Sequence, residues 1–112
     1  MSRVAGLVLC KDERDVIEHS LGWLLTQVDR VYVTDNLSTD GTYDILDRMR
    51  HQHGVDRLQV GLDEEVAYRQ SAKITAMAEL ARADGFDWAV PVDADEFWRC
   101  ADTSVRIGDH LD

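Results

Sequence analysis

The sequence predicts an α/β fold, a doubly wound and mainly parallel sheet with helices on both faces. Two observations favour it. Short runs rich in apolar and β-branched residues alternate along the chain with segments of helical periodicity. Polar and acidic loops follow several of the apolar runs directly, as they do at the carboxyl ends of parallel strands. With 112 residues the chain is long enough for one domain and short for two, so we expect a single domain over residues 1–112.

The first half of the chain contains two predicted strand and helix units. Val4–Cys10 (VAGLVLC) is a continuous apolar run and is predicted to be a buried strand. Residues 12–27 are predicted to be a helix, with Asp12 as its N-cap. Its apolar stripe consists of Ile17, Leu21, Leu24 and Val28. Residues 31–34 (VYVT) form the second predicted strand, and the polar loop DNLSTDGT leads into a helix over residues 42–52.

The second half continues the alternation. Residues 57–61 (RLQVG) are a weaker third strand, and residues 65–83 form a long helix. The core-facing stripe of that helix consists of Ile74, Met77, Ala78 and Ala81. Residues 87–92 (DWAVPV) are the fourth strand, and residues 104–111 begin another helix. Trp88 and Trp98 are expected to pack in the core, as is the apolar-flanked Cys10.

Three polar segments are expected to converge at one edge of the sheet. KDER, DNLSTDG and DADEF follow strands one, two and four, and ligand sites in parallel sheets gather at the carboxyl ends of the strands. The helix from residue 65 begins at the same edge, which brings Arg69, Gln70 and Lys73 close to it. For Arg69 and Lys73, an exposed helix face explains the sequence equally well.

The charge of the chain limits its partners. Asp and Glu number 22 against 12 Lys and Arg, giving a formal net charge of −10. This composition argues against nucleic acid binding, which normally needs a basic face. An anionic substrate would need a divalent cation, because the cation reverses the sign of the local field.

The acidic stretch VPVDADEFW is the candidate metal site. Asp93 and Asp95 are one residue apart at a strand end, so their side chains point to the same side if the backbone stays extended. Neighbouring carboxylates repel each other unless a cation lies between them, and hard oxygen ligands select Mg²⁺ or Mn²⁺. An isolated Asp-x-Asp is more typical of solvated acids, but the preceding strand and the following EFW favour a metal site.

The loop after the second strand contains a candidate binding residue as well as turn chemistry. Asp35 is the first residue after that strand and is expected to face the edge cleft, where its carboxylate can accept from a nucleobase imide or a ribose hydroxyl. Residues 38–42 are interpreted as turn and helix-capping residues. Lys11 and Glu13 fit helix-start electrostatics and a binding role equally well.

The location of the protein is predicted from its N-terminal residues. The apolar run Val4–Cys10 is short and meets charged residues without a small-residue cleavage site, which argues against a secretory signal. No apolar run approaches the roughly 18 residues that a membrane span needs. A cytoplasmic location and no transmembrane segment are therefore expected.

Four stretches together resemble the nucleotide-binding half of family-2 glycosyltransferases of the GT-A fold, in the branch with DWxxxxDxDEF. They are KDERDVIEHSLGWLL, VYVTDNLSTDGTYDIL, QSAKITAMAELA and DWAVPVDADEFW. The resemblance implies a Rossmann-like fold and transfer of a sugar from a nucleotide diphosphate donor, with Mn²⁺ or Mg²⁺ on the diphosphate, to an acceptor hydroxyl of a glycan, lipid or protein. Inversion is the expected stereochemical course.

The resemblance also implies roles for individual residues. Glu13 and Asp35 would contact the base and ribose, and Asp95 the metal, while Asp93 would contact either the ribose or the metal. The complete nucleotide-binding set is Lys11, Glu13, Asp35, Asn36, Gln70, Lys73 and Asp93, and the metal set is Asp93 and Asp95.

The chain departs from the family pattern at some positions. Leu9 and Lys11 replace the usual proline and tyrosine, and Asn36 with Leu37 replaces a common Asp-Gly pair. Members of the family continue well past the Asp-x-Asp, so the chain is expected to be a fragment whose general base lies beyond Asp112. Such a truncated sheet is expected to expose apolar surface and to self-associate.

Two other functions remain open at this point. A receiver-like signalling module has similar size, acidity and topology, but it needs an aspartate directly after strand three and a lysine after strand five. Asp63 is a poor fit, and no such lysine follows. A noncatalytic remnant that acts as an interaction domain is the second alternative.

Overall fold

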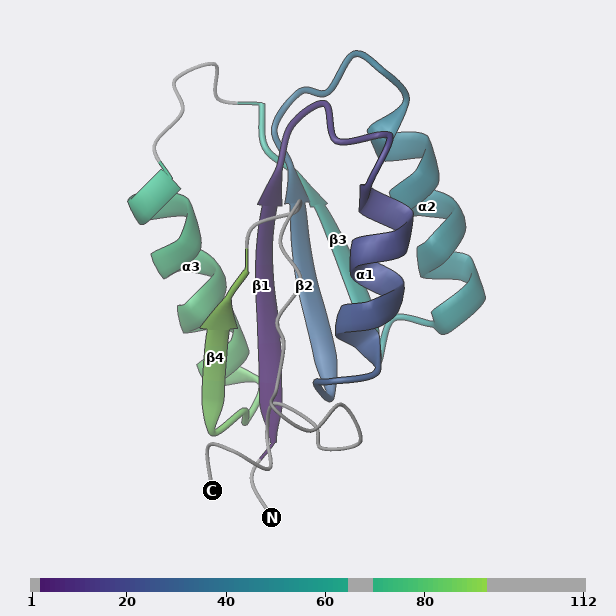
Figure 1. Cartoon of the computed structure of the whole chain (residues 1–112). Helices are drawn as coiled ribbons and strands as arrows, with labels where there is room; N and C mark the ends of the chain where they lie inside the picture. The colour runs from purple at the N-terminus through teal and green to yellow at the C-terminus, as the bar shows by residue number, and fades with distance from the viewer. Residues whose placement is uncertain (1–2, 65–69, 93–112) are drawn as a thin grey trace.

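The computed structural model describes residues 3–64 and 70–92, and they form one parallel sheet with helices on both faces (Figure 1). All strand pairs are parallel, and the strand order is β3-β2-β1-β4. The strands are β1 (Val4–Cys10), β2 (Arg30–Asp35), β3 (Leu58–Leu62) and β4 (Trp88–Pro91). The predicted α/β class and parallel sheet are confirmed. The helix predicted at residues 104–111 lies outside the described residues.

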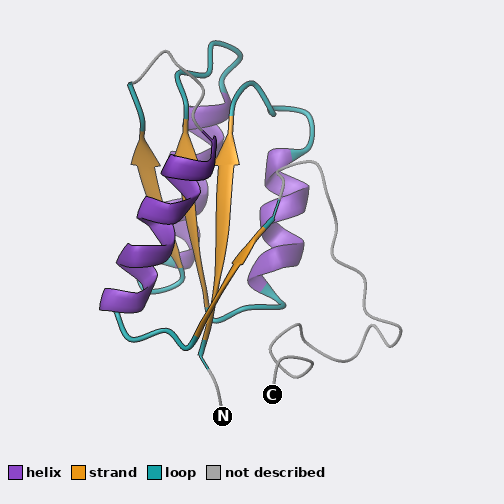
Figure 2. Ribbon diagram, turned by 90° about the vertical axis from the view of Figure 1, so that its left-hand side faces the viewer, coloured by secondary structure: helices purple, strands orange, loops and turns teal. Residues whose placement is uncertain are grey.

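The helices form two layers around the sheet. They are α1 (Ile17–Leu25), α2 (Thr42–His53) and α3 (Gln70–Ala83). Helices α1 and α2 cover one face, and α3 covers the other (Figures 1 and 2). The doubly wound arrangement is therefore confirmed. In the described part of the chain, no helix is long and apolar enough to cross a membrane.

The larger core lies between the sheet and α1 with α2. Every residue of β1 is buried, as expected for a central parallel strand with both faces covered. The predicted stripe of α1 is confirmed, since Ile17, Leu21, Leu24 and Val28 are each at most 2% exposed. Gly6 permits this close packing, because a Cβ there would lie 3.0 Å from Cδ2 of Leu24.

The smaller core lies between the sheet and α3. Met77 and Ala81 are buried, and Ile74 and Ala78 pack against the same cluster, which confirms the predicted stripe. Trp88 is different, because it is 43% exposed and its assignment to the core was wrong. Trp88 is the first residue of β4, and β4 pairs only with β1 among the described strands.

Helix α1 begins later than the sequence indicates. Its N-cap residue is Val16, which makes no side-chain capping hydrogen bond, so the prediction of Asp12 as the cap was wrong. Asp12 has a left-handed backbone conformation with φ 54° and lies in the loop between β1 and α1. Its carboxylate accepts a hydrogen bond from the backbone of a different loop, as described below.

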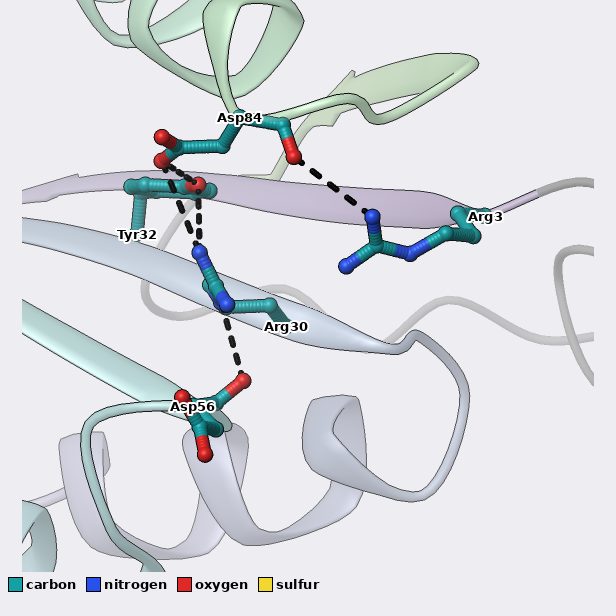
Figure 3. A network of polar contacts seen from close by, with 5 residues as sticks. All are labelled: Arg3, Arg30, Tyr32, Asp56 and Asp84. Carbon is teal, nitrogen blue, oxygen red and sulfur yellow. Dashed lines mark hydrogen bonds and ion pairs between the residues drawn. The ribbon is translucent and has the colours of Figure 1, made fainter.

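A polar network connects the segments around the amino ends of the strands (Figure 3). The Tyr32 hydroxyl donates to Oδ2 of Asp84 over 2.5 Å, and Nη1 of Arg30 donates to the Tyr32 oxygen over 3.0 Å. Arg3 and Arg30 both lie over the Phe86 ring, with Cζ 4.2 and 5.1 Å from its centroid. This network connects the turn after α3 to β1 and β2, at the opposite end of the strands from the candidate site.

The carboxyl ends of three strands lie level with one another. Cys10 pairs with Asp35 between β1 and β2, and Asp35 pairs with Leu62 between β2 and β3. Strand β4 is shorter, since its last residue, Pro91, pairs with Leu7. The expected convergence at one edge is confirmed for the segments after β1 and β2. Residues 93–97 (DADEF) lie outside the described part of the chain.

Candidate functional site

The loops after β1 and β2 are joined by reciprocal hydrogen bonds. The backbone N–H of Asp12 donates to Oγ of Ser38 over 2.8 Å, and the backbone N–H of Thr39 donates to Oδ1 of Asp12 over 2.7 Å. Each loop thus supplies one side-chain acceptor to the backbone of the other. These bonds fix the two loops relative to each other and account for the position of Asp12 outside the helix.

A second set of bonds ties the same loops where α2 begins. Asp40 accepts from the backbone N–H and the hydroxyl of Thr42, at 3.0 and 2.5 Å, and from the backbone N–H of Arg14 at 3.1 Å. The Thr42 hydroxyl oxygen accepts from the backbone N–H of Glu13 at 3.0 Å. These bonds, above all that from the Thr42 hydroxyl, hold the pKa of Asp40 below its usual 3.8. The interpretation of residues 38–42 as turn residues is supported by these bonds, while the N-cap residue of α2 is Gly41, which makes no side-chain capping hydrogen bond.

Asp35, the last residue of β2, is covered by the loop that follows this strand. It is 1% exposed, and its Oδ2 accepts from the backbone N–H of Ser38 at 3.0 Å while its Oδ1 accepts from the Ser38 hydroxyl. Sγ of Cys10 lies 3.8 Å from the same Oδ1. Burial, and then the Asp35 charge, raise the pKa of the Cys10 thiol, which stays protonated as a core residue. The Asp35 carboxylate faces its own loop in this conformation, so its contact with a ligand stays a prediction.

Asp63 follows β3 and contacts two other segments, the loop after β2 and helix α3. It follows the last residue of β3, and its carboxylate Oδ2 forms an ion pair with Nζ of Lys73. Nδ2 of Asn36 donates to both the carboxylate Oδ2 and the backbone oxygen of Asp63, each over 3.3 Å. The expected approach of Lys73 to this edge is confirmed.

Asp63 was missing from the residues that the sequence singled out for this site. The signal that could have found it is the same rule of strand ends, because Asp63 and Glu64 directly follow the third strand. Only the loops after strands one, two and four were assigned to the site by that rule. Lys73 then has a partner that the helical pattern of α3 alone did not reveal.

The structure brings only some of the predicted residues together. Asp35, Asn36 and Lys73 meet around Asp63 and the end of β2. Lys11 is exposed and Glu13 half-buried in the loop after β1. Gln70 is the first residue of α3. The side chain of Gln70, together with Arg69, Asp93, Asp95 and Trp98, lies outside what the structure describes.

A groove lies beside the ion pair, on the face of the sheet that carries α3. It has a volume of about 310 Å³. Its lining consists of Thr34, Asp63, Lys73, Ala76, Met77 and Leu80. The Thr34 hydroxyl donates to Sδ of Met77 over 3.3 Å. The groove therefore has an apolar wall and a charged end. Within residues 3–64 and 70–92, no three His, Cys, Asp or Glu side chains gather as a metal site.

Comparisons with known proteins give a likeness to a solved structure. No family model matches the sequence, and no curated protein matches it. Among solved structures, the mannosyltransferase PcManGT from Pyrobaculum calidifontis, in complex with GDP-Man and Mn²⁺, is similar with a TM-score of 0.72 and 25% identity. The match covers 88% of this chain and 29% of that chain, so this chain spans under a third of its neighbour. The likeness supports a relationship to glycosyltransferases.

Proposed function

We propose that the chain is the donor-binding part of a metal-dependent, inverting glycosyltransferase of family 2, and that it binds a nucleoside diphosphate sugar. The observation that carries this proposal is the likeness, over 88% of the chain, to a mannosyltransferase that holds GDP-Man and Mn²⁺. The strand order β3-β2-β1-β4 supports it, because it is the order of nucleotide-binding sheets in which ligands lie at the carboxyl ends of the strands.

The proposed site combines the polar residues at that edge. The nucleotide would contact Lys11, Glu13, Asp35, Asn36, Gln70, Lys73 and Asp93, and the metal would be held by Asp93 and Asp95. The two aspartates offer only hard oxygen atoms, which are the ligands that Mn²⁺ and Mg²⁺ take. When bound, the cation neutralises the negative charge that develops on the departing diphosphate.

The described residues contribute binding and orientation. The interlocked loops after β1 and β2 form a fixed surface at the carboxyl edge, because each supplies hydrogen bonds to the other. Lys73 adds a positive charge beside that surface, in a chain whose net charge is −10. This ammonium, although paired with the Asp63 carboxylate, would attract the oxygen atoms of an anionic donor.

Calorimetric titration with GDP or UDP, with and without Mn²⁺, tests the proposal. We expect binding that requires Mn²⁺ and that is lost in Asp95→Asn. Asp56→Asn is the matched control, because it removes the same charge from an exposed residue whose backbone oxygen accepts from Arg30 at the opposite edge. Binding that is indifferent to Mn²⁺, or equal in Asp95→Asn and wild type, would contradict the assignment.

The strand order bears on the receiver-like alternative. Asp63 does follow β3 directly, so the objection to its position was wrong. The described order, however, places β3 at an edge, whereas receiver-like sheets have the order 2-1-3-4-5. The remnant alternative would gain support if the wild-type protein bound neither nucleotide.

We also propose that the chain self-associates. Strands β3 and β4 each pair on one side only in the described sheet, and open strand edges are templates for pairing. Large apolar side chains that are exposed include Leu37, Val55, Leu62, Leu80 and Trp88. Light scattering should give a mass that rises with concentration, and a monodisperse monomer would count against the proposal. A cytoplasmic location stays a prediction, which cell fractionation would check.

A further inference from the structure

The ion pair between Asp63 and Lys73 is largely shielded from solvent. The Lys73 side chain is 10% exposed and that of Asp63 is 20% exposed. By contrast, the pair of Arg48 and Glu18 on the surface is 53% and 57% exposed. The low exposure of the first pair means that both charges have lost much of their hydration.

Stability alone is a weak reason for such a pair. The attraction between two sequestered charges is offset by the cost of removing them from water, so apolar replacements are often neutral or stabilising. What the pair does provide is a defined position for a flexible side chain. A lysine ammonium on its four-carbon stem has many rotamers, and one short contact to a fixed carboxylate selects among them.

Asp63 itself is well fixed. Its backbone N–H donates to the Asp35 oxygen over 2.8 Å, which continues the β2–β3 ladder one residue past the end of β3. Its carboxylate and backbone oxygens both accept from Nδ2 of Asn36, and this orients the amide because only the nitrogen can donate. Asp63 thus sets the position of two side chains, Asn36 on the loop after β2 and Lys73 on α3.

We propose that Asp63 is the positioning residue of the donor site: it holds the Lys73 ammonium and the Asn36 amide so that Lys73 meets oxygen atoms of the bound nucleotide. This inference rests on the proposed function and assigns a role to a residue outside the donor set named above. Lys73 lines the groove next to Asp63, so its ammonium lies at the charged end of a space of about 310 Å³.

The first test replaces the carboxylate without changing its size. Asp63→Asn keeps an oxygen that can accept from Asn36 but removes the charge that holds Lys73. We expect GDP or UDP, titrated with Mn²⁺, to bind about tenfold more weakly or worse, the loss of one charge-assisted contact. Glu18→Gln, which breaks the exposed pair with Arg48, is the matched control and should leave nucleotide affinity unchanged.

The second test separates positioning from a structural role. A charge-swapped protein carrying both Asp63→Lys and Lys73→Asp restores an ion pair between the same two positions. We expect its stability to recover relative to Asp63→Asn. Its nucleotide affinity should stay low, because the ammonium is then carried by residue 63, after β3, and no longer by residue 73 on α3. A swap that restores both stability and affinity would overturn the inference.

A third measurement, amine labelling, needs no nucleotide and therefore does not depend on a binding titration. The chain has only two lysines, Lys11 and Lys73, so amine labelling followed by mass spectrometry compares them within one sample. Lys73 should react more slowly than the exposed Lys11 in wild type and should speed up in Asp63→Asn, while Lys11 is unchanged. Added nucleotide with Mn²⁺ should protect Lys73 in wild type.

The outcomes distinguish the two proposals. Wild-type binding with unchanged affinity in Asp63→Asn would overturn the role of Asp63 and leave the proposed function standing. A wild-type protein that binds neither GDP nor UDP would overturn the proposed function and, with it, the role of Asp63 at a donor site. Equal labelling of Lys73 in wild type and Asp63→Asn would show that Asp63 does not hold the ammonium.

Discussion

Asp12 occupies a backbone conformation that few residues tolerate, with φ 54°. Aspartate and asparagine adopt this conformation more readily than alanine, and the Asp12 carboxylate also accepts from the Thr39 N–H. We therefore expect Asp12→Ala to lower the free energy of unfolding by about 1–2 kcal/mol, and Asp12→Asn to lower it far less. Chemical denaturation of the two variants measures the difference, and equal losses would contradict this explanation, because asparagine keeps both the acceptor oxygen and the tolerance for this conformation.

Asp40 provides a prediction about pH. Hydrogen bonds, above all from the Thr42 hydroxyl, lower the pKa of Asp40 in the folded protein below its usual 3.8. A carboxyl whose folded pKa is depressed stabilises the fold above its unfolded pKa, and this stabilisation is lost as the pH falls through the folded pKa. The stability difference between wild type and Asp40→Asn should be greatest near neutral pH and shrink in acid. Denaturation curves over the acid range check this, and a difference independent of pH would contradict it.

The sequence predicted the role of some residues but not their partners. Ser38 and Asp40 were interpreted correctly as turn residues, because their side chains favour turns wherever they occur. Asp12 was misplaced, because a capping preference does not reveal that an acceptor will be used by a loop 27 residues away. Asp63 was missed for the same reason: its partners, Asn36 and Lys73, become neighbours only when β2, β3 and α3 are assembled.

At the level of elements, the glycines of β1 and α1 differ in the space around them. A side chain at Gly6 would meet Leu24 and Val28, whereas a Cβ at Gly22 on α1 would meet nothing within 4 Å. Gly6→Val should lower the free energy of unfolding by about 1–3 kcal/mol through overpacking, and Gly22→Ala should raise it by roughly 0.5–1 kcal/mol through helix propensity. Denaturant titration compares both with wild type. A tolerated valine at Gly6 would mean that α1 can move away from the sheet without cost.

Periodicity predicted the faces of the helices better than their ends. The stripe of α1 is buried and that of α3 is buried or packed against the core, because burial of one helix face is what produces the pattern. The start of α1 could not be predicted, since the residues before Ile17 form backbone hydrogen bonds around Glu13 and side-chain bonds to another loop. The exposure of Trp88 also depends on which strands flank β4, and that is a property of the sheet rather than of the segment.

For the molecule as a whole, alternation of strands and helices predicted the class of fold but not the strand order. The parallel pairing of β1 with β4 joins segments more than 80 residues apart, and no local pattern encodes it. That pairing bears on the proposed function, because it makes the carboxyl end of β4 point in the same direction as the carboxyl ends of β1 and β2. Val92, the last described residue there, donates its N–H to Leu7 over 2.9 Å.

Nucleotide binding at that edge should stabilise the whole domain. A ligand that binds only the folded state at about 100 times its dissociation constant adds roughly 2.7 kcal/mol to the free energy of unfolding. For a chain of this size the melting temperature should then rise on the order of 10 °C when GDP or UDP is present with Mn²⁺. Differential scanning fluorimetry measures the shift, with nucleotide alone and Mn²⁺ alone as controls. Because the proposed site needs both components, either one alone should give a much smaller shift, and the sum of the two separate shifts should fall short of the shift given together. Purely additive shifts would mean that nucleotide and metal bind independently, which is incompatible with nucleotide binding that requires the metal.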